Sequence, residues 1–236
     1  MSVEGKRGTK QGKIPKWETE LWSYVSSGDG MLCPMYSRCQ NRLSGVWCPS
    51  DNLDYITQLL DNRRFDVSKY DFVVKRGECG RVFQLVEVLA QKYLKMGRVR
   101  CPPVPTALVA LVDQRGAIEV RLLALKAYHG AIWHLKDGWI IQLKANDTSA
   151  VKRFTLLHEA FHILAHHRTT PVFKKRGAIQ GSFNELLADY FAICILTPRR
   201  WVKEKWAEVK NLDRMAKIFG VPKPVMGIRL RQLGLI

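Results

Sequence analysis

The stretch Arg153–His167, RFTLLHEAFHILAHH, contains two histidines and a glutamate in the pattern H-E-x-x-H. His158 and His162 are four residues apart, so on a helix they lie on one face and their imidazoles can reach a single metal ion. Glu159 stands where a carboxylate can accept a proton from a metal-bound water. The alternative is an ordinary helix with two half-buried histidines, which the many apolar neighbours would also suit.

A catalytic zinc site needs a third protein ligand. The extended pattern with a third histidine is excluded, because Ala165 and Arg168 occupy the positions of its glycine and its histidine. The segment SFNELLADYFAICIL, residues 182–196, offers Glu185, with Asp189 one helical turn later. Asp189 could accept the free N–H of a ligating histidine, whereas Glu185 could also serve as part of a helix capping box. Together with the upstream motif, the pair favours a ligand role for Glu185.

These segments together resemble the ImmA/IrrE family of bacterial and phage zinc metallopeptidases. RFTLLHEAFH matches the family's histidine helix, and NELLADYFAICILTP matches its second motif, E-x-x-A-[DN]-x-F-A followed by L-x-P. LDRMAKIFGVPKPVMGIRLRQLGL is similar to the family's closing helices, so the resemblance runs from about Pro102 to the end. The chain departs from the family at Phe161, where glycine is common, and at Leu187, where a second acidic residue is common.

The resemblance implies a zinc-dependent endopeptidase that cleaves a helix-turn-helix transcriptional repressor and so derepresses genes of stress responses or anti-phage defence. On this basis Zn²⁺ is the expected cofactor and a repressor protein the expected substrate. The resemblance implies these roles: zinc ligands His158, His162 and Glu185, general base Glu159, and Asp189 orienting a ligand.

Two further features of the substrate site are expected. A substrate peptide should lie along the strand GWIIQLK, residues 138–144, and pair with its backbone as an added strand. The group that stabilises the oxyanion is open among Tyr128, His134 and Tyr190, each of which also suits a purely structural role.

The wider pattern predicts an α+β fold, in which a small, mostly antiparallel sheet of about three strands packs on a helical bundle that carries the H-E-x-x-H helix. We expect three parts: a flexible basic tail over 1–16, a cysteine-containing and partly helical region over 17–100, and a metallopeptidase domain over 101–236. Strands are expected at 117–126, 130–136 and 138–144. Helices are expected at 53–62, 82–96, 106–116, 149–168, 182–196, 198–208, 211–219 and 223–233.

Composition narrows the class of protein. The chain has 236 residues, is 47% hydrophobic and contains no apolar run long enough to span a bilayer, so we expect a globular, cytoplasmic protein. Its six cysteines show no pattern of a secreted disulfide framework and should be free thiols or metal ligands. The net charge of +17 favours a polyanionic partner such as nucleic acid.

The cysteines suggest two hypotheses. Cys101, in RVRCPPVP, resembles the R-C-x-x-P core of the cysteine switch in matrix metalloproteinase propeptides, so its thiolate could fill the open zinc position until it is displaced. The alternative for Cys101 is an ordinary buried free thiol. A structural metal site could be formed by Cys33, Cys39, Cys48 and Cys79, although separate buried thiols suit their spacing better.

The basic residues suggest a contact with DNA. RRWVKEKW, residues 199–206, interleaves cations with two tryptophans, as in proteins that bind single-stranded DNA. The resemblance links activation to DNA damage and so implies single-stranded DNA as an activator. The alternatives are an amphipathic helix with solvated cations, and, for the whole protein, a nucleic-acid-binding regulator with a structural or inactive metal site. The cations concerned are Arg199, Arg200, Lys203 and Lys205.

Overall fold

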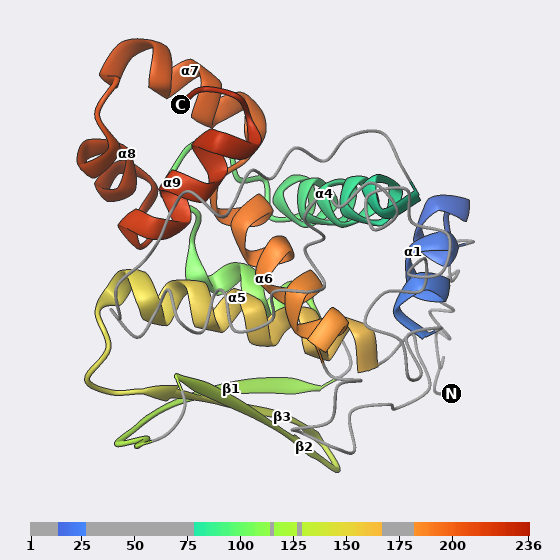
Figure 1. Cartoon of the computed structure of the whole chain (residues 1–236). Coiled ribbons are helices and arrows are strands. Elements are labelled where there is room, and N and C mark those ends of the chain that lie inside the picture. Colours follow the sequence, from blue (N-terminus) through green and yellow to red (C-terminus); the bar gives the residue numbers. More distant parts are fainter. Residues whose placement is uncertain (1–13, 27–77, 114–115, 127–128, 167–181) are drawn as a thin grey trace, which may run out of the picture.

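A three-stranded sheet covered on one face by helices forms the frame of the molecule (Figure 1). This computed structural model describes residues 14–26, 78–113, 116–126, 129–166 and 182–236. The helix predicted at 53–62 lies outside these residues. The strands are β1 (Ala117–Leu123), β2 (Gly130–Leu135) and β3 (Gly138–Lys144). The helices are α1 (Lys16–Ser26), α4 (Glu78–Met96), the 3₁₀ helix η3 (Thr106–Leu111), α5 (Ser149–His166), α6 (Ser182–Leu196), α7 (Arg199–Val209), α8 (Leu212–Phe219) and α9 (Lys223–Gln232).

The sheet has the order β1-β3-β2 and confirms the predicted α+β fold. Its pairing is mixed, because β3 runs antiparallel to β2 and parallel to β1. A two-residue loop between β2 and β3 requires them to be antiparallel, while β1 joins the other edge of β3. The helix expected over 106–116 is a shorter 3₁₀ helix, η3.

α5 lies across one face of the sheet (Figure 1). β3 presents Trp139, Ile141 and Leu143 to this side, and all three are buried. Thr148 caps the start of α5, since its Oγ1 accepts a hydrogen bond from the backbone N–H of Val151 at 3.3 Å. Burial of its apolar side chains fixes α5 on the sheet, and α5 is the helix that carries the H-E-x-x-H motif.

α6 forms the next layer and packs against both α5 and α4. The ring of Phe191 lies 5.6 Å from that of Phe161 in α5 and 6.4 Å from that of Tyr93 in α4, measured between centroids. Trp22 of α1 lies 6.0 Å from Phe161. A single hydrophobic core therefore includes α1 and α4 together with the helices that follow the sheet.

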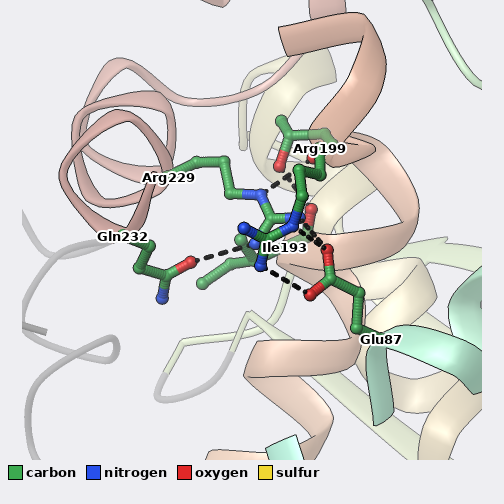
Figure 2. Close-up of polar contacts among 6 residues, drawn as sticks. Glu87, Ile193, Arg199, Arg229 and Gln232 are labelled. Carbon is green, nitrogen blue, oxygen red and sulfur yellow. Dashed lines mark hydrogen bonds and ion pairs between the residues drawn. The ribbon is translucent and has the colours of Figure 1, made fainter. Parts of the chain in front are cut away.

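A buried arginine joins the C-terminal helices to this core (Figure 2). The side chain of Arg229, in α9, is fully buried and donates hydrogen bonds to the carboxylate of Glu87 at 2.8 Å and to the carbonyl oxygen of Thr197 at 3.0 Å. Arg199 donates to both oxygens of Glu87, at 3.0 and 3.2 Å. The network connects α4, the end of α6, α7 and α9, and so fixes the helix that carries Glu185 and Asp189.

Candidate metal centre

α5 and α6 bring three possible ligand side chains to one point. Nε2 of His158 lies 3.1 Å from Nε2 of His162 and 3.1 Å from Oε2 of Glu185. Nε2 of His162 lies 3.3 Å from Oε1 of Glu185. Within the described part of the chain, these are the residues that form a group able to hold a metal ion. Two separate sequence motifs therefore meet as the spacing predicts.

The dimensions of this cluster fit a tetrahedral metal. Zinc binds histidine nitrogen and carboxylate oxygen at about 2.0–2.2 Å, so two ligand atoms of a tetrahedral site are separated by about 3.3–3.6 Å. The observed separations of 3.1, 3.1 and 3.3 Å lie at or slightly below the lower end of that range. The donor set of two imidazoles and one carboxylate is also the set found in catalytic zinc sites that keep a fourth position open.

Asp189 lies behind the cluster. Its Oδ1 is 2.7 Å from Nδ1 of His158, and both side chains are largely buried. This contact places a proton on Nδ1 and leaves Nε2 free to bind a metal. Burial alone would lower the pKa of His158, but the carboxylates of Asp189 and Glu185 outweigh it and raise that pKa well above its ordinary value.

Glu185 contacts the imidazoles of both His158 and His162. Half of its side chain is exposed, so the cluster is open to solvent on this side. Burial tends to raise the pKa of Glu185, but the neighbouring imidazoles of His162 and His158 hold it below its ordinary value. The structure thus has the ionised carboxylate that a metal ligand requires.

Glu159 is buried beside the cluster without belonging to it. Its side chain reaches the first residue of β2, and its Oε1 lies against Gly130. A carboxylate next to the ligands but outside their group can accept a proton from a water molecule held between them. The sequence did not lead us to Gly130, although a glycine in a strand is a known sign of close approach by another group.

The strand predicted to receive substrate is in the wrong position for that role. β3 is the central strand and is paired on both sides, so its backbone has no edge to offer. The sequence could not reveal this, because the apolar pattern of β3 is the same for a central and an edge strand. β2, which passes Glu159, pairs only with β3 among the described residues.

The oxyanion candidates lie in different surroundings. Tyr190 is buried and packs edge-to-face on Phe83, at 4.8 Å between ring centroids. His134, on β2, is exposed, and its ring lies 4.3 Å from that of Trp139 and 4.8 Å from that of His166. Tyr128 lies outside the described residues.

Neither of the two cysteines whose side chains the structure describes belongs to the cluster. Cys101 is a free, exposed thiol and does not belong to the group of ligand side chains. Cys194 is buried in α6 as expected, and burial raises its pKa to about 11. Cys33, Cys39 and Cys48 lie outside the described residues, and so does the side chain of Cys79.

Three of the four basic residues of α7 are held in ion pairs. Arg199 contacts Glu87, while Arg200 lies 3.2 Å from Glu204 and Lys205 lies 2.8 Å from Glu208. Lys203 is exposed. Both tryptophans of this helix are partly buried against the core.

The last of the closing helices, α9, has its faces buried against the rest of the protein. α9 buries six consecutive residues, from Val225 to Leu230, so its faces are used in packing. A recognition helix must instead offer side chains to a DNA groove.

None of the described helices is long and apolar enough to cross a membrane.

Comparison with known proteins assigns a family to the half of the chain that carries this site. The family model Peptidase_M78, described as the IrrE N-terminal-like domain, matches residues 114–231. No curated protein matches the chain. A solved structure of a Mycobacterium tuberculosis transcriptional regulator is similar at 17% identity and a TM-score of 0.46, over 61% of this chain and 46% of that one. The chain thus matches less than half of that protein's length.

Proposed function

The chain belongs to the peptidase family of IrrE N-terminal-like domains, and on this premise we propose that it is a zinc-dependent endopeptidase. The observation that carries the proposal is the convergence of His158, His162 and Glu185, with ligand atoms separated as in a tetrahedral site. When bound, zinc would lower the pKa of a water molecule and polarise a peptide carbonyl.

Three residues of the chain have the remaining catalytic and positioning roles. Glu159 accepts the proton of the attacking water and passes it to the leaving amine. Asp189 accepts the Nδ1 hydrogen of His158 and so keeps Nε2 directed at the metal. The open side at Glu185 lets substrate reach the centre.

The edge of β2 is the proposed docking site for the substrate backbone. An extended peptide added to this edge would pass Glu159 at Gly130 and continue past the exposed side chains of Trp133 and His134. Strand addition supplies affinity through backbone hydrogen bonds and leaves selectivity to the side chains along the groove. His134 remains the candidate for stabilising the oxyanion, since it is the exposed one of the two described candidates.

The substrate we propose is a helix-turn-helix transcriptional repressor, whose cleavage derepresses stress or defence genes in the cytoplasm. The catalytic unit spans 101–236, and region 17–100 packs α1 and α4 against it. The proposal includes an inhibited state in which the thiol of Cys101 is a zinc ligand. Because this thiol is exposed and outside the cluster, that state requires segment 101–105 to move.

The net charge of +17 supports a second candidate function, a nucleic-acid-binding regulator whose metal site is structural or inactive. Under the first proposal, single-stranded DNA that contacts Arg199, Arg200, Lys203 and Lys205 is instead an activator of the peptidase.

Glu159→Gln separates the two functions. The zinc-loaded protein is incubated with a helix-turn-helix repressor encoded beside it, with and without single-stranded DNA, and cleavage is followed by mass spectrometry. The peptidase proposal expects the wild type to cut and the variant to bind zinc and DNA equally but not to cut. Cleavage by neither protein favours the regulator, whereas equal cleavage by both would contradict the role of Glu159 as the general base.

A further inference from the structure

Gly130, the first residue of β2, lies so close to α5 that no side chain fits between them. A Cβ at this position would be 2.4 Å from the Cγ2 methyl of Thr155 and 2.8 Å from Oε1 of Glu159. Non-bonded carbon atoms are normally about 3.5–4.0 Å apart. Any side chain at position 130 would therefore force one of these groups, or the strand itself, to move.

The requirement for glycine is one of space. The backbone of Gly130 does not have the positive φ that would itself favour glycine, in contrast to Gly220 and Gly234 at φ +62° and +65°. Glycine in a strand weakens it, because the residue loses more backbone entropy and packs no side chain. The close approach of β2 to α5 is therefore the structural gain that offsets this cost.

The two groups that face Gly130 differ in how easily they can move. Thr155 is β-branched and sits in a helix, which restricts its χ1 angle, and it is buried. Glu159 contacts the same point with the far end of a flexible side chain. A side chain at position 130 would thus displace the Glu159 carboxylate or push β2 away from α5.

We propose that Gly130 is a positioning residue, which sets the place of the Glu159 carboxylate relative to the metal ligands and to the substrate-binding edge of β2. This inference rests on the proposed peptidase function. Misplacement of a catalytic group by about 1 Å costs about 100-fold in rate. The atoms nearest to a Cβ at position 130 belong to Thr155 and Glu159 and not to a zinc ligand, so the affinity for the metal should not change.

The test compares Gly130→Ala, Thr155→Ser and the double variant, each loaded with zinc. Gly130→Ala should reduce kcat about 100-fold, with KM and zinc affinity close to those of the wild type. Thr155→Ser removes the methyl group that a new Cβ would strike, so the double variant should regain about tenfold or more of the lost kcat. Gly227→Ala is the matched control, because a Cβ at Gly227 in α9 meets no atom within 4 Å.

A second measurement does not depend on cleavage. A peptide hydroxamate chelates zinc and hydrogen-bonds to the general base, so calorimetry of its binding reports the position of Glu159. Gly130→Ala should weaken this binding about tenfold, as expected for a lost hydrogen bond to a charged group, and the double variant should restore part of it. If the wild type cuts nothing but hydroxamate binding follows this pattern, the peptidase proposal fails and the positioning role stands.

Three results would overturn the inference. The first is that Gly130→Ala has the same kcat and hydroxamate affinity as the wild type. The second is that its zinc affinity falls by the same factor as its kcat. The third is that the double variant regains none of the lost kcat or hydroxamate affinity. If Gly130→Ala does not fold, a folded and active double variant still supports the role of the Thr155 contact. An unfolded double variant contradicts it, since some other group would then require glycine.

Discussion

Replacement of Asp189 by asparagine tests how the chain prepares its metal ligands. The change removes one negative charge but keeps an oxygen atom and nearly the same volume. In the structure the Asp189 carboxylate accepts a hydrogen bond from Nδ1 of His158 at 2.7 Å, in a largely buried setting. Asparagine can accept the same hydrogen bond, so the variant isolates the contribution of the charge.

The size of the effect follows from the two kinds of hydrogen bond. A hydrogen bond to a charged group contributes about 1.5–3 kcal/mol and a neutral one about 0.5–1.5 kcal/mol. The difference is on the order of 1.4 kcal/mol, which corresponds to about a tenfold weaker zinc affinity. This agrees with the lower end of the 10–100-fold range typical of such supporting residues.

Competition titration against a chromophoric zinc chelator measures this affinity. Protons compete with zinc for His158, and Asp189 raises the pKa of that histidine, so the variant also relieves part of the competition. The titration is therefore repeated at rising pH until the affinity of each protein stops changing. Asp213→Asn, at an exposed ion pair with Lys223, is the matched control. An unchanged zinc affinity in Asp189→Asn would refute the orienting role.

Four other outcomes are expected. Arg229→Met should lower the free energy of unfolding by about 3–5 kcal/mol, because it removes a buried partner of Glu87. A loss below about 1 kcal/mol in urea titration would contradict the stabilising role of the network around Glu87. Burial tends to raise the pKa of Glu87, but Arg199 and Arg229 hold it below its ordinary value of 4.5. The stabilisation that ionised Glu87 gives the folded protein is thus present above pH 4.5 and lost as pH falls through the lower folded pKa. The melting temperatures of the wild type and Glu87→Gln should therefore converge in acid. Parallel curves of melting temperature against pH would speak against this. Cys101→Ala should raise basal proteolysis of the repressor, and unchanged basal activity would end the switch hypothesis. Changing the cations of α7 should weaken binding of single-stranded oligonucleotides and flatten its salt dependence; an unaltered salt slope would remove α7 from the DNA contact.

The sequence predicted most of the described elements because they depend on local periodicity, but it did not predict α1, Lys16–Ser26. Apolar spacing and turn residues located the strands and the helices from η3 onward, and η3 alone differed in type. Spacing of four residues placed His158 and His162 on one face, and Glu185 with Asp189 on another. That these two faces would meet was indicated by the joint occurrence of the two motifs and by their resemblance to the ImmA/IrrE family.

Features that depend on packing between distant segments were not predictable. Strand order decides that β3 is central, and an apolar alternation is the same in either position. Nothing local marks Arg229 as fully buried or pairs it with Glu87, which lies 142 residues away. Gly130 likewise gains its meaning only when β2 is placed against α5.

The central claim is that the two motifs form a working zinc centre with Glu159 as its base. The most direct measurement is cleavage of the repressor by the zinc-loaded wild type and by Glu159→Gln, with the zinc content of both proteins determined in parallel. We predict one molar equivalent of zinc in each, as for a single metal centre, and cleavage only by the wild type. Zinc-independent cleavage, or equal cleavage by the variant, would contradict the account.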